Sequence, residues 1–358
     1  MKAGVIGATG YAGAELVRLL SRHPKIDSLL LSSVSFEGEK IDEVYPNFQG
    51  RVDTALVGAE QVMSAADVVF AALPHGVGEQ YAKTCVEKEI PFIDLSADFR
   101  FGDDEAAYST WYGKPHQYPQ LCKYAVYGLP ELNRARIKEL AASGKVIAGN
   151  PGCYPTGASL GVFPAIAKGL AEGGATIIVN AVSGVTGGGR EPSRALHYAE
   201  CADSVSAYKV GSHRHMPEIA RNLAQMAARH NRPAPPVIFT PHLAPMNRGI
   251  LSTIYIPIAA AWRGGKKDAA EICAVYDDFY RDEPFVRVLP RVTAATGRVR
   301  QSNYCDISVH LDHSGSTLIV CSAIDNMVKG AAGQAVQNMN VIFDYDETSG
   351  LEMIPALF

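Results

Sequence analysis

The chain has 358 residues, which is enough for about two domains and a sizeable hydrophobic core. Hydrophobic residues make up 47% and charged residues 20% of it, which excludes a wholly disordered chain. The net charge of −4 gives no reason to expect a nucleic-acid partner, and no run of about 18 apolar residues predicts a membrane span. Seven scattered cysteines without a C-x-x-C pair indicate reduced thiols, and the first residues leave no room for a signal peptide. We therefore expect a cytoplasmic protein.

The first 150 residues alternate strand-like and helix-like segments. The apolar runs are continuous, as in strands that are covered on both faces. Strands alternating with helices predict a parallel, doubly wound α/β sheet of the Rossmann type with right-handed crossovers. The expected strands are 3–6, 28–32, 67–72 and 92–95, and the expected helices are 13–20 and 76–88.

The pattern changes near residues 147–151. The segments 304–310 and 317–324 alternate polar and apolar residues, which is typical of antiparallel strands with one wet face. Further strands are expected at 177–183, 237–240 and 251–257, and helices at 158–171, 216–230, 266–281 and 326–342.

A glycine-rich turn stands between the first strand and the first helix. Gly7, Gly10 and Gly13 leave room for backbone N–H groups to approach a pyrophosphate, and the helix N-terminus adds a partial positive charge. The spacing G-x-x-G-x-x-G is a weak signal alone, but its position in a βαβ pattern favours a dinucleotide site. A glycine turn kept only for tight helix packing is the alternative. The remaining turn residues that are candidate cofactor contacts are Thr9, Tyr11 and Ala12.

The end of the second strand indicates which dinucleotide binds. A site for NAD usually has Asp or Glu there to accept a hydrogen bond from the ribose 2′-hydroxyl. This chain has Ser33 and Ser35 instead, with Lys40 nearby, and these residues suit a 2′-phosphate. The sequence therefore favours NADP, against the alternative of an exposed loop without a ligand.

Cys153 is the candidate nucleophile. It follows an Asn-Pro-Gly turn and precedes an apolar helical segment, and a helix N-terminus lowers the pKa of a thiol. A cysteine is by default a small buried hydrophobic residue. That default suits the other cysteines, namely Cys85, Cys122, Cys201, Cys273 and Cys321, with Cys305 less certain. Glycine and two prolines fix the backbone around Cys153, which leaves both interpretations open for this residue.

Two histidines could supply the acid–base group that a cysteine nucleophile needs. His213 and His215 would share one face of an extended segment, with Arg214 on the other face. One imidazole would then transfer protons while the other orients substrate. No third ligand motif supports a metal site, and a polar loop is the alternative. In the segment LPHG, Pro74 and His75 follow a strand end and are expected to border the cofactor.

Together these segments resemble the N-acetyl-γ-glutamyl-phosphate reductase family, NADPH-dependent enzymes of arginine biosynthesis that are related to aspartate-semialdehyde dehydrogenase. The resemblance covers essentially the whole chain. One departure is Val34, where the family often carries an arginine, so Ser33, Ser35 or Lys40 would contact the 2′-phosphate. The shared motifs are GATGYAGAEL, LPHG, DLSADFR, YGLPELNR, GNPGCYPT, SGVTGGGR, HRHMPEI, FTPHLAPMNRGIL and DNMVKGAAGQAVQNMN.

The resemblance implies a reaction. The Cys153 thiolate would attack the acyl phosphate and expel phosphate, NADPH would reduce the resulting thioester, and His213 or His215 would handle the proton. It also implies a nucleotide domain at 1–150 with the C-terminal helix 326–358. A mixed α+β catalytic domain at 151–325 follows, of the semialdehyde dehydrogenase or glyceraldehyde-phosphate dehydrogenase type. Related enzymes are homodimers or homotetramers.

The resemblance further implies sites for substrate and nicotinamide. Arg100 is the first choice for the substrate phosphate, because arginine suits oxyanions. Ser183, Gly184 and Gly187 would approach the nicotinamide, and Asn326 its carboxamide. Asn133 is a weaker substrate candidate. Arg190, Arg194, Arg214 and Arg248 are further candidates, and each of these arginines is equally suited to a surface or structural ion pair. A related acyl phosphate as substrate, and a non-catalytic NADP-binding regulator, remain alternative functions.

Overall fold

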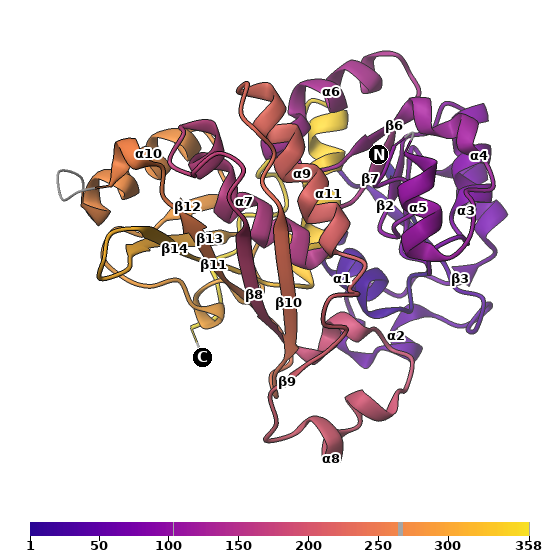
Figure 1. Ribbon diagram of the computed structural model, residues 1–358. Coiled ribbons are helices and arrows are strands. Elements are labelled where there is room, and N and C mark those ends of the chain that lie inside the picture. Colours follow the sequence, from indigo (N-terminus) through magenta and orange to yellow (C-terminus); the bar gives the residue numbers. More distant parts are fainter. Residues whose placement is uncertain (103, 264–267, 358) are drawn as a thin grey trace. The chain divides into compact units, whose positions relative to one another are not determined.

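The computed structural model describes residues 1–102, 104–263 and 268–357 and divides into two compact units (Figure 1). The first unit consists of Met1–Pro151 and Ala331–Met353, and the second of Gly152–Gly330 and the segment that begins at Ile354. Residues 326–330 and 354–357 therefore belong to the second unit, not to the nucleotide unit in which the sequence placed them. In the part of the chain that the structure describes, no helix is long and apolar enough to cross a membrane.

The first unit is built on a parallel sheet. Its strands are β1 Lys2–Ile6, β2 Ser28–Ser32, β3 Leu56–Val57, β4 Val68–Ala71, β5 Phe92–Asp94, β6 Ala125–Tyr127 and β7 Ile147–Gly149. They lie in the order β3-β2-β1-β4-β5-β7-β6, and every neighbouring pair is parallel. The predicted doubly wound sheet is therefore confirmed. The strand order reverses between β1 and β4, which is where such sheets bind dinucleotides, at the carboxyl ends of the strands.

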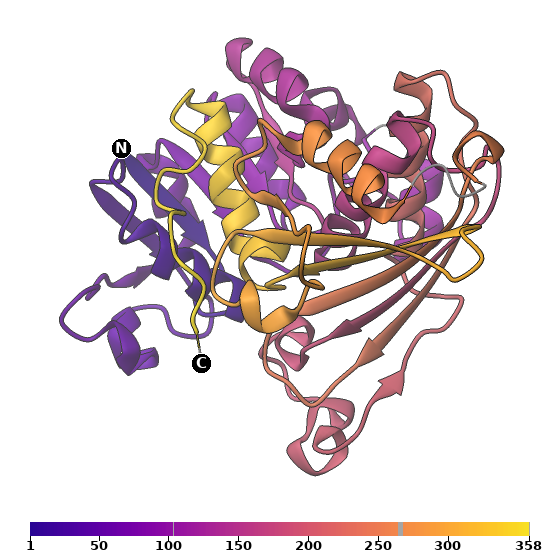
Figure 2. The same ribbon diagram turned by 90° about the vertical axis from the view of Figure 1, so that its left-hand side faces the viewer.

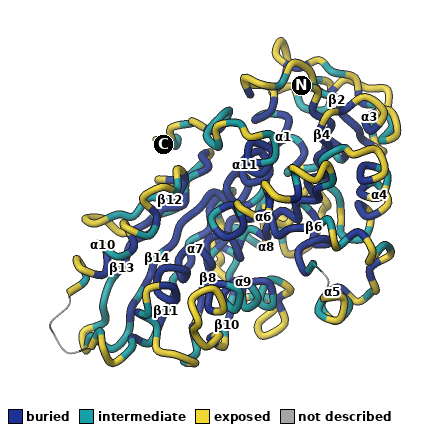
Figure 3. Tube along the Cα trace, turned by 90° about the horizontal axis from the view of Figure 1, so that it is seen from above, coloured by how far each residue is buried: buried dark blue, intermediate teal, exposed yellow. Residues whose placement is uncertain are grey.

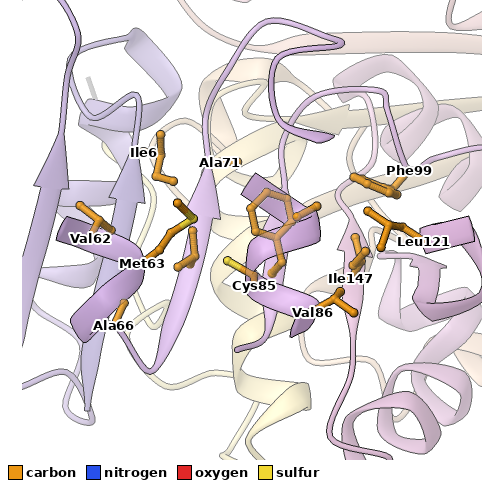
Figure 4. Close-up of a cluster of buried hydrophobic side chains, with 13 residues drawn as sticks. Ile6, Val62, Met63, Ala66, Ala71, Cys85, Val86, Phe99, Leu121 and Ile147 are labelled. Carbon is orange, nitrogen blue, oxygen red and sulfur yellow. The ribbon is translucent and has the colours of Figure 1, made fainter. Parts of the chain in front are cut away.

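Helices connect these strands and bury the sheet. They are α1 Tyr11–Leu20, α2 Ile41–Val44, α3 Ala59–Ala65, α4 Glu79–Glu87, α5 Glu105–Tyr112, α6 Pro130–Ala142 and α11 Gly333–Ile342. Figure 4 shows one side of the core, where Val62 and Met63 of α3 and Cys85 of α4 pack with residues of the strands. β4 and nearly all of α11 are buried, and Figure 3 shows α11 in dark blue.

The second unit is built on a mixed sheet. Its strands are β8 Ile177–Ser183, β9 Ser206–Ala207, β10 Val237–Leu243, β11 Ile250–Pro257, β12 Val286–Val288, β13 Cys305–Leu311 and β14 Thr317–Ile324. They lie in the order β12-β13-β14-β11-β8-β10-β9, and Figure 2 shows the long strands side by side. β13 and β14 are antiparallel, as their alternation predicts, whereas β8 and β10 are parallel.

Helices cover one face of this sheet. They are α7 Cys153–Ala167, α9 Met216–Arg229 and α10 Ala269–Tyr280, whereas the short helix α8 Tyr198–Cys201 lies in the connection that leads to β9. α7 contacts β11 and β14, and α9 contacts β10. Along β8 the residues alternate between buried and more exposed, with Ile177 and Val179 buried and Ile178 exposed. The sheet therefore has one covered face and one open face within this chain. The first two residues of the expected helix 266–281 lie outside the described residues.

Two predicted helices differ in their starts. α7 begins at Cys153, five residues before the expected position, because Pro155 is tolerated in the first turn of a helix. The segment 326–342 is not one regular helix, since a π-helical turn at Val328–Ala332 precedes α11. The Asp325 carboxylate accepts hydrogen bonds from the N–H groups of Met327 and Val328 and fixes the entry to this turn.

Candidate active site

The glycine-rich turn follows β1 and opens α1. Gly7 has φ of +84°, and a Cβ there would lie 2.5 Å from the carbonyl oxygen of Ala72. A Cβ on Gly13 would overlap the carbonyl oxygen of Gly7. Tight packing therefore explains these two glycines. It does not explain Gly10, whose added Cβ would meet only the Gly7 carbonyl, at an ordinary 3.6 Å. Gly10 is the N-cap of α1, where a bare backbone suits the approach of a phosphate.

Hydroxyl groups connect this turn to the end of β2. The Thr9 and Ser33 hydroxyls lie 2.7 Å apart and are buried, and the Tyr45 hydroxyl donates to the Thr9 carbonyl. Ser35 and Lys40 are exposed, and Lys40 stands at the N-cap of α2. β2 ends in Ser32 and carries no acidic residue, so the group that would accept from a ribose 2′-hydroxyl is absent from this strand.

The LPHG loop lies at the same edge of the parallel sheet, after β4. Pro74 is exposed and His75 is half-buried. The Gly76 N–H donates to both carboxylate oxygens of Asp98 at 2.7 Å, and Asp98 also accepts from the Tyr108 hydroxyl. The loop is therefore held by a buried carboxylate rather than by regular secondary structure.

Cys153 is the first residue of α7 in the second unit and is half-buried. The preceding Gly152 N–H donates to the buried Glu218 carboxylate of α9 at 2.7 Å. On another side, a Cβ on Gly330 would lie 2.7 Å from the Cys153 Cβ. The position of the thiol is thus fixed from two directions. Cys153 lies at the N-terminal end of α7, where the backbone of a helix carries a partial positive charge.

Cys153 opens into a pocket of about 570 Å³ in the second unit. The lining brings the thiol together with both predicted histidines and with the glycine-rich loop after β8. Its residues are Cys153, Tyr154, Ser183, Gly184, Gly187, Gly188, Ala195, Leu196, Glu200, Ser204, Ser206, Tyr208, Lys209, His213, Arg214, His215 and Leu243. The pocket thus combines a thiol, two imidazoles, two cations and the carboxylate of Glu200.

The two imidazoles meet for a different reason from the one the sequence suggests. The segment 210–215 forms turns leading into α9 and is not extended, so the prediction that Arg214 faces away from both histidines is wrong. The backbone N–H of His215 donates to the ring Nδ1 of His213 at 3.1 Å, and the centroids of the two imidazole rings lie 4.9 Å apart. The Tyr154 ring lies against both imidazoles, at 5.7 Å from His213 and 5.9 Å from His215.

Burial and charge set the ionisation of the pocket. Burial, with the charges of Lys209 and Arg214, lowers the pKa of His213 to about 4. His213 is therefore neutral near pH 7, in keeping with Nδ1 as an acceptor. Burial also raises the pKa of Tyr208 to about 12, and raises that of Tyr154, whose hydroxyl accepts from Tyr208 at 3.0 Å. Both phenols are thus protonated donors.

Of the substrate residues predicted from sequence, Arg214 lines this pocket, and Arg100, Asn133, Arg190, Arg194 and Arg248 do not. Arg100 is buried in the first unit and donates to the carbonyls of Asn150 and Leu95. Asn133 donates to the Tyr127 carbonyl at a kink in α6. Arg190 is exposed, and Arg194 is 89% exposed and paired with Glu200. The lining residues that sequence reasoning missed include Tyr208 and Lys209, whose signal is their place just before the histidine pair.

Asn326 has a shaping role in the second unit. Its side-chain oxygen accepts from the Gly249 N–H at 2.8 Å, and its nitrogen donates to the Thr186 hydroxyl at 3.0 Å. These bonds use both ends of the amide to hold the glycine-rich loop that contains Gly184 and Gly187. Across the described residues no group of three or more His, Cys, Asp or Glu side chains could hold a metal ion.

Comparison with known proteins connects these two units to a family. Residues 2–140 match the model described as semialdehyde dehydrogenase, NAD binding domain, and residues 153–326 match semialdehyde dehydrogenase, dimerisation domain. Relatives named N-acetyl-gamma-glutamyl-phosphate reductase are 46% identical in Clostridium kluyveri, Clostridium beijerinckii and Brachyspira hyodysenteriae, covering 100% of both chains. The chain belongs to the N-acetyl-γ-glutamyl-phosphate reductase family.

Solved structures place the family fold among semialdehyde dehydrogenases. An aspartate semialdehyde dehydrogenase II from Vibrio cholerae aligns with a TM-score of 0.72 at 18% identity, covering 96% of this chain and 99% of that one. A Candida albicans aspartate semialdehyde dehydrogenase with NADP aligns with a TM-score of 0.68 at 18% identity, covering 96% and 98%. The predicted fold class is therefore confirmed: a Rossmann-type parallel sheet and a mixed α+β unit of the semialdehyde dehydrogenase type.

Proposed function

We propose that this chain catalyses the NADPH-dependent reduction of N-acetyl-γ-glutamyl phosphate to N-acetylglutamate semialdehyde, with release of phosphate, in arginine biosynthesis. The names of relatives that match over their full length support the substrate. The observation that carries the proposal is the position of Cys153 at the start of α7, in a pocket with two imidazoles.

The chemistry begins at the Cys153 sulfur. The thiolate attacks the acyl carbon, a C–S bond forms, and the bond between that carbon and the phosphate oxygen breaks, which leaves a thioester and free phosphate. When bound, NADPH supplies the hydride that reduces this thioester. The resulting thiohemiacetal collapses as the C–S bond breaks, and the aldehyde leaves while Cys153 recovers its thiolate. Covalent catalysis divides one difficult reduction into two easier steps.

His215 is assigned as the acid–base residue and His213 as its positioning partner. An acid–base group works best with a pKa near the operating pH, and burial holds the pKa of His213 near 4. His213 also uses its Nδ1 to accept the His215 N–H. This donor is the backbone N–H of His215, so His213 fixes the backbone that carries its neighbour. His215 is left to protonate the oxygen of the tetrahedral intermediate and to remove the proton as the aldehyde forms.

NADP is proposed as the cofactor over NAD, held by the turn at Gly7, Gly10 and Gly13. Gly10 leaves an open backbone for the pyrophosphate, and no acidic side chain ends β2. Ser33, Ser35 and Lys40 would hold the 2′-phosphate, and Pro74 and His75 would border the cofactor. Lys40→Met should raise KM for NADPH at least about fivefold while leaving KM for NADH unchanged. Equal changes for both cofactors would contradict this assignment.

The test of the function uses the reverse reaction, because the semialdehyde is more stable than the acyl phosphate. The full chain should reduce NADP in the presence of phosphate or arsenate with N-acetylglutamate semialdehyde, and far more slowly with aspartate semialdehyde. Cys153→Ser should lower this activity by at least about 10³-fold and keep NADPH binding in a fluorescence titration. Full activity of the variant would refute the covalent route, and preference for aspartate semialdehyde would refute the substrate.

The chain is further proposed to act as a homodimer. The matching domain model carries the description dimerisation domain. On the open face of the mixed sheet, Ile178 of β8 lies in register with Ile238 of β10, and their exposed fractions are 37% and 53%. Neighbouring exposed isoleucines on a sheet are typical of an interface.

A further inference from the structure

A buried ion pair in the first unit lies behind the loop 73–76, which follows β4. A Cβ on Gly7 would lie 3.2 Å from the Leu73 side chain, so this loop lies against the turn proposed to hold the cofactor. We infer that the ion pair between His116 and Glu79 positions the loop for NADPH, and that NADPH binding weakens when His116 loses its proton. This inference rests on the proposed function, because it concerns the same cofactor site.

The geometry of the ion pair requires a charged imidazole. Nδ1 of His116 lies 2.9 Å from Oε2 of the Glu79 carboxylate, and the two side chains are 3% and 1% exposed. The other ring nitrogen, Nε2, lies 3.1 Å from the carbonyl oxygen of Asp98. Both ring nitrogens therefore face acceptors, and an imidazole has a proton on each nitrogen only in its charged form.

Glu79 holds the segment 114–118 through the same carboxylate oxygen. This oxygen accepts hydrogen bonds from the backbone N–H groups of Gln117 at 2.6 Å and Tyr118 at 3.2 Å. The other oxygen, Oε1, is buried and has no hydrogen-bond partner among the described residues. A buried carboxylate with such an oxygen needs a positive charge beside it, and protonated His116 supplies that charge.

The segment 114–118 in turn holds the loop. The Lys114 ammonium donates to the His75 carbonyl at 3.1 Å, and the Gln117 side-chain amide donates to the Gly76 carbonyl at 3.2 Å. A Cβ on Gly76 would overlap the Lys114 ammonium, so the lysine side chain lies directly on the loop. The ion pair therefore reaches the loop through a short chain of hydrogen bonds.

The charges around His116 favour its protonated form. Burial opposes a charge on this imidazole, but the hydrogen bond and ion pair with Glu79, together with the charge of Asp98, outweigh burial. They raise the pKa of His116 above its usual value of about 6.5. Burial also opposes a charge on Glu79, but the same contact with His116 outweighs it and lowers the pKa of the Glu79 carboxyl.

Other ionisable groups lie in the same cluster. The Tyr108 ring of α5 lies 5.4 Å from that of His116, and its hydroxyl donates to the Asp98 carboxylate. Burial raises the pKa of Tyr108, so its hydroxyl keeps its proton. Burial and the charge of Asp98 also raise the pKa of Asp94, whose carboxylate accepts from the Ser96 hydroxyl. The titration of Asp94 therefore has to be separated from that of His116.

Loss of the Nδ1 proton from His116 would bring two lone pairs together. The neutral ring would keep its Nε2 proton for the Asp98 carbonyl, so Nδ1 would present a lone pair to the Glu79 oxygen at 2.9 Å. Because the folded pKa of His116 is raised, the ion pair stabilises fully below the unfolded pKa of about 6.5, and its effect is lost as the pH rises through the folded value. The loop should then loosen and NADPH affinity should fall.

The experiment measures the Kd for NADPH by fluorescence titration at pH 7 and pH 9. Binding is measured rather than turnover, because a thiol nucleophile itself becomes more reactive as the pH rises. The wild-type Kd should rise at least about fivefold between the two pH values. His116→Gln and Glu79→Gln should bind NADPH weakly at pH 7, and their Kd should change by less than about twofold up to pH 9. His313→Gln is the matched control, because this histidine is exposed in the second unit and its loss should leave the wild-type dependence unchanged.

Two results of this titration would overturn the inference. One is the same pH dependence, or none, in the wild-type protein and in His116→Gln. The other is a dependence that disappears in Asp94→Asn but remains in His116→Gln, which would assign it to Asp94. A dependence that remains in Asp94→Asn and disappears in His116→Gln supports the inference.

Hydrogen exchange of residues 73–78 tests the ion pair without the cofactor. If the wild-type protein binds no NADPH, the proposed cofactor is wrong, and the exchange rates decide separately whether the ion pair holds the loop. At pH 7 these amides should exchange at least about fivefold faster in His116→Gln than in the wild-type protein, and at pH 9 the two rates should be similar. Comparing two proteins at one pH removes the intrinsic pH dependence of exchange. Glu79→Gln gives the same comparison if His116→Gln does not fold, and equal rates at pH 7 would overturn the inference.

Discussion

At the scale of single residues, the environment separates one thiol from the others. Burial raises the pKa of Cys85 to about 12 and also raises the pKa values of Cys273 and Cys321, which makes these thiols poor nucleophiles near pH 7. Cys153 instead starts a helix at the wall of a pocket. The sequence alone left Cys153 open between a packed and a reactive side chain. Its place among pocket groups, with the N–H of the preceding Gly152 held by Glu218, favours the reactive one.

The ionisation of His213 predicts a pH dependence of stability. In the unfolded chain this imidazole takes up a proton near its ordinary pKa of about 6.5, whereas burial lowers the folded value to about 4. The unfolded state therefore binds more protons below pH 6.5, and stability is lost as the pH falls toward 4. The loss from this residue is about 3 kcal/mol at pH 4. Urea unfolding at pH 7 and pH 4 should show a correspondingly smaller decrease for His213→Gln, and parallel decreases would contradict the assignment.

Between secondary-structure elements, close backbone contacts determine where Cys153 lies. α7 and the π-helical turn meet where Gly330 lies against Cys153. α11, which follows this turn, is buried although it carries several amides, because Asn338 and Asn340 donate to backbone carbonyls of neighbouring loops. The composition of this stretch predicts close packing, and the structure supplies hydrogen-bond partners for the buried amide nitrogens of Asn338 and Asn340.

Two glycine substitutions in the turn between β1 and α1 should have different effects, one on stability and one on cofactor binding. Gly13→Ala should destabilise the first unit by about 1–3 kcal/mol, because its Cβ would overlap the Gly7 carbonyl. Gly10→Ala should fold normally, since its Cβ would meet only an atom at 3.6 Å, yet it should weaken NADPH binding by standing in the path of the phosphate. Urea unfolding and fluorescence titration distinguish the two effects. Full NADPH affinity in Gly10→Ala would count against a phosphate at this turn.

The contact between Gly330 and Cys153 can be tested by substituting Gly330 and comparing the result with a control glycine. In Gly330→Ala the new methyl group would lie 2.7 Å from the Cys153 Cβ and force the nucleophile or the π-helical turn to move. We expect kcat to fall by about 10²-fold with NADPH binding retained, because small misplacements of reacting groups are costly. Gly297→Ala is the control, since a Cβ there would meet nothing within 4 Å. Unchanged kcat in Gly330→Ala would show that the thiol position tolerates this crowding.

In the whole molecule, one unit is built on a parallel sheet, whose strand ends are the proposed cofactor site, and the other is built on a mixed sheet covered by α7, the helix that begins at Cys153. Helices cover one face of the mixed sheet. If the other face is apolar, it is expected to be buried against another protein surface. Ile178 on β8 and Ile238 on β10 are exposed apolar residues on this face, and such residues are expected to be buried at an interface.

The dimer therefore has a direct test. Ile178→Asp should shift the mass measured by sedimentation from dimer toward monomer, because a carboxylate would have to be buried at the interface. Val34→Asp is the control, as this residue is 92% exposed in the first unit and should leave the mass unchanged. A dimer that survives Ile178→Asp would place the interface elsewhere.

Local sequence patterns are enough to predict the repeating features of the fold. Apolar runs and alternation identified the long strands and helices, and the glycine turn and the Asn-Pro-Gly-Cys segment marked the two chemical positions. Short elements such as β3, β6 and α2 carry too few residues to show a period. Which side chains lie close together depends on the tertiary packing. In the folded chain, the side chains of Arg100 and Asn133 donate hydrogen bonds to backbone carbonyls. The segment 210–215 forms turns, and Arg214 lines the same pocket as His213 and His215. Contacts of this kind depend on turns and on packing between distant segments, so local sequence patterns do not predict them.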